Sequence, residues 1–141
     1  DKEMTRFTIT LEQGVELVLK TLDSMIGGEL VVPKIPSFKI LDLTKAIDDK
    51  KKISVIGIRP GEKKHEELIT SADSFNTYEF KKYYTILPTV PNFKLVDFIS
   101  KFNAKLVPQG FSYSSGTNSD WETVESLRSL IKKHLDPNFK I

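Results

Sequence analysis

The strongest constraint on the fold is the alternation of helical and extended patterns along the 141 residues. Apolar residues recur at helical spacing between residues 11 and 26, and the glycines at 27 and 28 end that predicted helix. A short apolar run at 30–32 predicts a buried strand, and the β-branched segment 53–58 predicts the clearest strand of the chain. Helices and strands that alternate in this way indicate an α/β fold.

Weaker patterns complete this outline. Further strands are predicted at 7–9, 76–80 and 83–87. Helices are predicted at 41–47 and 63–69, and residues 93–102 indicate either an amphipathic helix or part of a variable insertion. Asp120 is expected to cap a last helix that continues to residue 135.

Composition excludes several function classes. The chain has 21 Lys and Arg against 19 Asp and Glu, a net charge of +2, which gives no electrostatic reason to expect nucleic acid or an anionic membrane as a partner. No cysteine is present, so a disulfide scaffold, a thiolate metal site and a cysteine nucleophile are excluded. The two histidines are too few for a histidine-rich metal site, and the apolar runs are too short for a membrane span. We therefore expect a cytoplasmic protein without a metal.

The seven glycines form neither a GxGxxG sequence nor a phosphate-binding loop. The chain is therefore not expected to bind a dinucleotide cofactor by itself. A Tyr-x-x-x-Lys pair occurs at Tyr78 and Lys82, but it falls on a predicted strand without a Rossmann unit before it. We interpret that pair as coincidental and predict no catalytic residue in the chain.

The first candidate site is the turn Arg59-Pro60-Gly61-Glu62, which follows the segment 53–58. Proline sets one φ angle and glycine permits a tight turn, here with a positive φ expected at Gly61. The planar guanidinium of Arg59 suits a pyrophosphate, and Glu62 could accept hydrogen bonds from sugar hydroxyls. The more common meaning of such a pattern is an ordinary turn in which the two charged side chains pair with each other.

Arg6 is a second candidate cation, because it stands at the start of the first predicted strand. Considered alone, it is more commonly an exposed arginine at a strand edge. His65 and Glu66 form a third group near Lys63 and Lys64. A solvated or hydrogen-bonded histidine is the favoured interpretation there, rather than a catalytic one.

Several segments taken together resemble one enzyme family. They are MTRF at 4–7 with ITLEQGV at 9–15, GE at 28–29 with VPKIPS at 32–37, IGIRPGEK at 56–63 with HEE at 65–67, and YSSGTN at 113–118. In this order they resemble the C-terminal part of the UDP-N-acetylglucosamine 4,6-dehydratases. These are lyases of the extended short-chain dehydrogenase/reductase group that act in flagellin-sugar and capsule-polysaccharide biosynthesis.

The resemblance implies a single substrate-binding lobe over residues 1–141. A family-like core would span 1–87, a variable insertion 88–111, and a C-terminal loop and helix 112–141. In the family this lobe closes over a UDP-sugar held against an N-terminal Rossmann domain that carries NADP. Carried over by motif, the substrate-binding residues are Met4, Arg6, Arg59 and Glu62. The fold implied is therefore a C-terminal lobe with short alternating strands and helices and no complete Rossmann domain.

The resemblance also implies what the chain lacks. The cofactor loop and the catalytic tyrosine and lysine of the family would lie before Asp1, so the chain alone is expected to be inactive and to bind no NADP. A lobe without its Rossmann partner would expose apolar surface, and self-association would be one way to cover it. The alternative is a stand-alone, non-catalytic α/β module for interaction or assembly, and binding of UDP would separate the two hypotheses.

Overall fold

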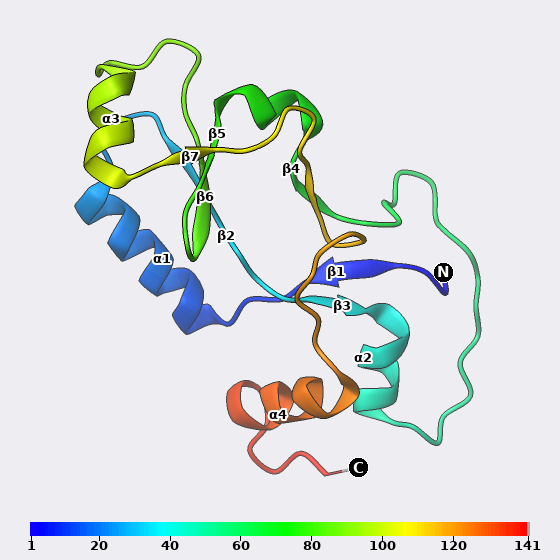
Figure 1. Ribbon diagram of the computed structural model, residues 1–141. Helices are drawn as coiled ribbons and strands as arrows, with labels where there is room; N and C mark the ends of the chain where they lie inside the picture. Colours follow the sequence, from blue (N-terminus) through cyan, green and yellow to red (C-terminus); the bar gives the residue numbers. More distant parts are fainter. Residues whose placement is uncertain (141) are drawn as a thin grey trace. The chain divides into compact units, whose positions relative to one another are not determined.

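The structure is a computed structural model that describes residues 1–140. Short strands and helices are mixed throughout the chain, which confirms the predicted α/β class (Figure 1). The chain divides into two compact units that are each built from separate segments. Unit one comprises residues 1–10, 35–66 and the chain from 114 onward, and unit two comprises residues 11–34 and 67–113.

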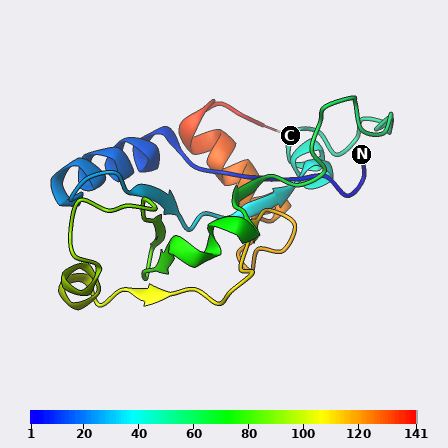
Figure 2. The same ribbon diagram turned by 90° about the horizontal axis from the view of Figure 1, so that it is seen from above.

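Unit one is built on a two-stranded antiparallel ladder. Strand β1 (Thr5–Phe7) pairs with β3 (Ser37–Lys39), with Arg6 opposite Phe38. Helix α2 (Ile40–Ile47) follows β3 directly, and helix α4 (Val124–His134) packs against α2. Both views show these two helices side by side (Figure 1 and Figure 2).

The contact between α2 and α4 has an apolar part and a polar part. Ala46 on α2 and Leu127 on α4 are both buried. The Arg128 guanidinium donates hydrogen bonds to the carbonyls of Lys45 and Ala46, at 3.1 and 3.4 Å. These carbonyls lie at the C-terminal end of α2, where backbone acceptors have no partner within the helix. Arg128 therefore ties the last helix to an element that lies about 80 residues earlier in the sequence.

Unit two contains a four-stranded antiparallel sheet in the order β2-β6-β5-β7. Its strands are β2 (Leu30–Pro33), β5 (Thr77–Glu79), β6 (Tyr83–Ile86) and β7 (Lys105–Leu106). The other elements of unit two are α1 (Leu11–Ser24), the 3-10 helix η1 (Ser71–Asn76), α3 (Leu95–Phe102) and β4 (Glu67–Ile69). Strand β4 pairs with β8 (Tyr113–Ser114), of which Tyr113 belongs to unit two.

The core of unit two is aromatic. Phe98 on α3 packs against Tyr78 on β5, and both side chains are buried. Three further aromatic residues surround this pair: Phe80, Phe93 and Phe102. Residues 93–102 thus confirm the amphipathic helix, because α3 places its apolar face on the sheet.

Two predicted elements and one predicted helix cap are wrong. Residues 53–58 form no strand, because their β-branched side chains lie exposed and have no neighbouring strand with which to pair. The predicted helix at 63–69 is instead an irregular segment that leads into β4. The last helix begins after Thr123 and not after Asp120, because the Thr123 side chain accepts a hydrogen bond from the Ser126 N–H and completes a capping box.

Candidate functional site

The turn at residues 59–62 is closed by hydrogen bonds in both directions. The Glu62 N–H donates to the Arg59 carbonyl at 3.0 Å, and the Arg59 N–H donates to the Glu62 carboxylate at 3.1 Å. Gly61 has a φ of 78°, which confirms the positive φ expected from the sequence. Proline followed by a glycine of positive φ is the pattern of a type II turn. The turn therefore holds the backbone of Arg59 and the carboxylate of Glu62 in one fixed arrangement.

Arg6 is held by protein acceptors on three of its nitrogens. Its Nη1 donates to the carbonyls of Thr5 and Lys64, at 2.7 and 3.3 Å, and its Nη2 donates to the Lys63 carbonyl at 3.0 Å. Its Nε lies 3.2 Å from a carboxylate oxygen of Glu66. The guanidinium is therefore oriented by the segment 63–66 rather than free to sample solvent.

The two arginines meet at one carboxylate. Arg6 Nη2 lies 4.0 Å from Glu62 Oε1, and Arg59 Nε lies 4.0 Å from Glu62 Oε2. The Arg6 side chain is 22% exposed, whereas the Arg59 side chain is 77% exposed. One cation of the pair is therefore fixed, and the other can move toward a ligand.

Arg6 and Arg59 do not lie on neighbouring strands, because β1 pairs with β3 and the segment before Arg59 is not a strand. Both arginines instead approach the carboxylate of Glu62, the last residue of the turn. Met4, the fourth predicted site residue, has a buried side chain, and its carbonyl accepts a hydrogen bond from the Ile40 N–H at 3.0 Å.

Three hydrogen-bonded polar side chains lie next to Arg6, and the sequence analysis did not predict this group. Thr5 Oγ1 lies 2.8 Å from His65 Nδ1 and 2.7 Å from Ser115 Oγ. Ser115 Oγ also accepts a hydrogen bond from the Glu66 N–H at 2.9 Å. His65 is thus a hydrogen-bonded histidine, as the sequence favoured. No local pattern pairs residues that stand 60 and 110 positions apart, so no sequence signal could have identified this group.

A further ion pair lies near the turn. The Lys64 ammonium donates a hydrogen bond to the Glu3 carboxylate. That hydrogen bond, with the attraction between the two charges, lowers the pKa of Glu3 below its ordinary value. Both side chains are solvent-exposed, so the pair contributes little to stability.

The chemistry available at this site is recognition of charge. Two guanidinium groups and one carboxylate can bind an anion and a hydroxyl group. Ser115 is completely buried, so its hydroxyl cannot reach a substrate as a nucleophile. Within residues 1–140, no group of three His, Cys, Asp or Glu side chains could hold a metal ion. None of the helices within residues 1–140 is both long and apolar enough to cross a membrane.

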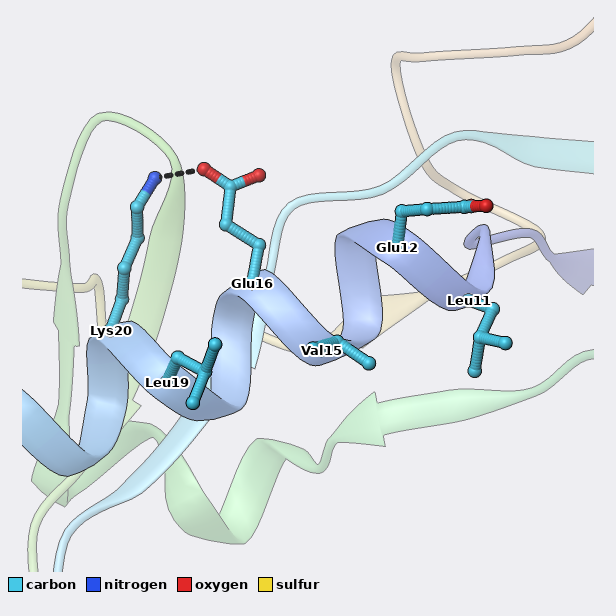
Figure 3. Close-up of a pocket in the computed structure, with 6 residues that line it drawn as sticks. All are labelled: Leu11, Glu12, Val15, Glu16, Leu19 and Lys20. Carbon is cyan, nitrogen blue, oxygen red and sulfur yellow. Dashed lines mark hydrogen bonds and ion pairs between the residues drawn. The ribbon is translucent and has the colours of Figure 1, made fainter.

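An open hollow of about 430 Å³ lies on α1 in unit two. Figure 3 shows its charged side chains on one side of the helix and its apolar side chains on the other. The residues that line it are Leu11, Glu12, Val15, Glu16, Leu19 and Lys20. All these residues come from the single helix α1 and do not converge from different elements, so we do not assign a ligand to the hollow.

Comparison with known proteins gives a consistent family. The family model described as "Polysaccharide biosynthesis protein" matches residues 1–88. The inverting UDP-N-acetylglucosamine 4,6-dehydratase of Campylobacter jejuni strain 81-176 is 46% identical over 138 residues, covering 93% of this chain and 40% of the dehydratase. A UDP-glucose 4-epimerase of Rickettsia canadensis is 38% identical over 90 residues, covering 61% of this chain and 26% of the epimerase.

A solved structure has the same fold. The X-ray structure of Pen from Bacillus thuringiensis superimposes with a TM-score of 0.73 at 30% sequence identity. The match covers 93% of this chain and 39% of Pen. This chain thus spans about 40% of the length of the dehydratases that it matches.

Proposed function

This chain belongs to the polysaccharide biosynthesis protein family, and from that premise we propose that it is the UDP-sugar-binding, C-terminal part of an enzyme like the UDP-N-acetylglucosamine 4,6-dehydratases. The observation that carries the proposal is the approach of Arg6 and Arg59 to the single carboxylate of Glu62. Residues 1–141 would act as one substrate-binding lobe.

The charges of the site residues suggest which part of a UDP-sugar each residue would bind. The pyrophosphate of a UDP-sugar would lie between the two guanidinium groups, where each charge-assisted hydrogen bond contributes roughly 1.5–3 kcal/mol if water is excluded. The Glu62 carboxylate oxygen that does not accept from the Arg59 N–H would accept a hydroxyl of the nucleotide sugar. Met4, immediately before β1, would lie beside the nucleotide, although its side chain is buried and offers little exposed apolar surface.

The whole reaction needs a cofactor that these residues do not fit. The glycines of this chain form no GxGxxG sequence or phosphate-binding loop that could hold a dinucleotide pyrophosphate. We propose that NADP and the catalytic residues belong to a Rossmann domain of a longer, cytoplasmic protein. That protein would be a lyase of the short-chain dehydrogenase/reductase type.

Replacing Arg59 with alanine is expected to weaken UDP binding by about 10- to 100-fold, because one charge-assisted hydrogen bond is lost. Isothermal titration calorimetry with UDP measures this on the 141-residue chain, whose own affinity we expect to be weak because the open site excludes little water. Lys52→Ala is the control, since Lys52 is also an exposed cation of unit one. In a full-length enzyme, Arg59→Ala should raise the KM for the UDP-sugar and leave NADP affinity unchanged.

Two results would contradict this proposal. If the chain binds no UDP at millimolar concentrations, the alternative of a non-catalytic interaction or assembly module is favoured. If Lys52→Ala weakens binding as much as Arg59→Ala, the attraction is diffuse and no clamp exists.

Self-association is a separate part of the proposal. Helix α1 buries none of its residues, and Leu11, Leu19 and Leu22 are each more than 60% exposed. Apolar side chains that are exposed in this number favour association. We expect sedimentation to show oligomers whose fraction rises with protein concentration. A purely monomeric profile at every concentration would refute it.

A further inference from the structure

The side chains of Thr5, His65 and Ser115 join three distant parts of unit one. Thr5 stands on β1, His65 follows the turn at 59–62, and Ser115 follows β8. Thr5 and Ser115 are buried, and His65 is half-buried. We call these three residues the brace.

One assignment of donors and acceptors satisfies every hydrogen bond of the brace. The Glu66 N–H can only donate, and it donates to Ser115 Oγ. If the Ser115 hydroxyl then donates to Thr5 Oγ1, the Thr5 hydroxyl donates to His65 Nδ1, and every donor has an acceptor. If the hydrogen bonds ran in the opposite direction, from His65 to Thr5 to Ser115, the hydroxyl hydrogen of Ser115 would have no acceptor within the brace. Ser115 is completely buried, so this direction is unfavourable. The arrangement is therefore one that uses His65 Nδ1 as an acceptor.

The brace fixes the acceptors that orient Arg6. The Thr5 N–H donates to the Lys64 carbonyl at 3.1 Å, and the Ser115 N–H donates to the Glu66 carbonyl at 2.8 Å. Together with the brace, these bonds hold the segment 63–66 against β1. The same segment provides the Lys63 and Lys64 carbonyls and the Glu66 carboxylate that bind the Arg6 guanidinium.

We infer that Thr5, His65 and Ser115 are positioning residues that hold Arg6 in the orientation needed for a nucleoside diphosphate. The identity of the ligand rests on the proposed function. The effect of the brace on Arg6 rests on the hydrogen bonds alone. The brace touches no ligand itself. It acts by keeping the segment 63–66 in place, so that the guanidinium is already oriented before a diphosphate arrives.

The variant that tests this is Thr5→Val, which keeps the shape of the side chain and removes its hydroxyl. Thr5→Ser keeps the hydroxyl and should restore the wild-type behaviour. Thr44→Val is the matched control, because the Thr44 hydroxyl of unit one donates to the Ile40 carbonyl within its own helix α2. Ser115→Ala breaks the brace at a second position, should Thr5→Val not fold.

The first measurement needs no ligand. Solvent exchange of the Arg6 Nε–H, followed by NMR, should be about tenfold faster in Thr5→Val and unchanged in Thr5→Ser and Thr44→Val. Equal exchange in wild type and in folded Thr5→Val would overturn the inference. This result stands whether or not the chain binds UDP, so it is distinguishable from failure of the proposed function.

The second measurement is a double-mutant cycle on UDP affinity. Thr5→Val should weaken UDP binding by about tenfold in the wild-type background and have no further effect once Arg6 is replaced by lysine. Thr44→Val should change neither. A loss from Thr5→Val that is equal in both backgrounds would show that the brace does not act through Arg6.

Discussion

Truncating Phe98 to alanine is expected to lower the free energy of unfolding of unit two by about 4 kcal/mol. Phe98 is only 5% exposed, and its ring is the centre of the aromatic core. The ring centroids of four neighbours lie 5.1 to 6.4 Å away, on Phe102, Phe93, Tyr78 and Phe80. The truncation leaves a cavity between α3 and β5 and removes all four ring contacts.

Urea denaturation followed by circular dichroism measures this loss. Phe75→Ala is the matched control, because that side chain is 61% exposed and its removal should cost less than about 1 kcal/mol. If the two variants lose the same amount of stability, α3 does not form the core of unit two.

Replacing Gly116 with alanine is expected to destabilise unit one by about 3 kcal/mol. A Cβ at this position would lie 2.7 Å from both Cγ and Nδ1 of His65, which is far inside van der Waals contact. The imidazole must move away, and that movement breaks its hydrogen bond to Thr5. The expected result is a lower midpoint of unfolding, together with faster exchange of the Arg6 Nε–H.

Two variants separate this steric effect from the general effect of adding a methyl group. Gly14 lies within α1, and apart from its neighbours and the backbone of its own helix nothing lies within 4 Å of its potential Cβ, so Gly14→Ala should be neutral or stabilise the helix by up to about 1 kcal/mol. Adding His65→Ala to Gly116→Ala removes the clash, so the double variant should lose less stability than the sum of the two single variants. Additive losses would contradict the steric explanation.

Local patterns predicted the elements whose formation depends on neighbours in the sequence. Helix α1 has the predicted apolar spacing and ends before Gly27. The strands predicted at 76–80 and 83–87 are present at 77–79 and 83–86, and they pair because only three residues separate them. Gly61 has its positive φ because a proline and a glycine in sequence favour one turn type.

The prediction of a strand at 53–58 was wrong because strand formation depends on more than local propensity. Its β-branched residues have a high strand propensity, but a strand requires a partner for its backbone groups and a surface to cover one face. Ile53, Val55, Ile56 and Ile58 are all exposed, so this segment has neither. Strand propensity describes the backbone conformations that a residue favours. Whether a strand forms also depends on pairing with segments that lie far away in the chain.

The sequence by itself determined the α/β class, the family and the residue types of the candidate site: two arginines, a glutamate and a tight turn. The binding role of these residues remains a prediction. Only the tertiary structure decided that Arg6 and Arg59 approach the same carboxylate, and that Arg6 is held by the segment 63–66. It also decided that Thr5 meets residues 60 and 110 positions away. The physical reason is that side-chain chemistry and turn geometry are local properties, whereas hydrogen bonds between distant segments exist only after the whole chain has packed.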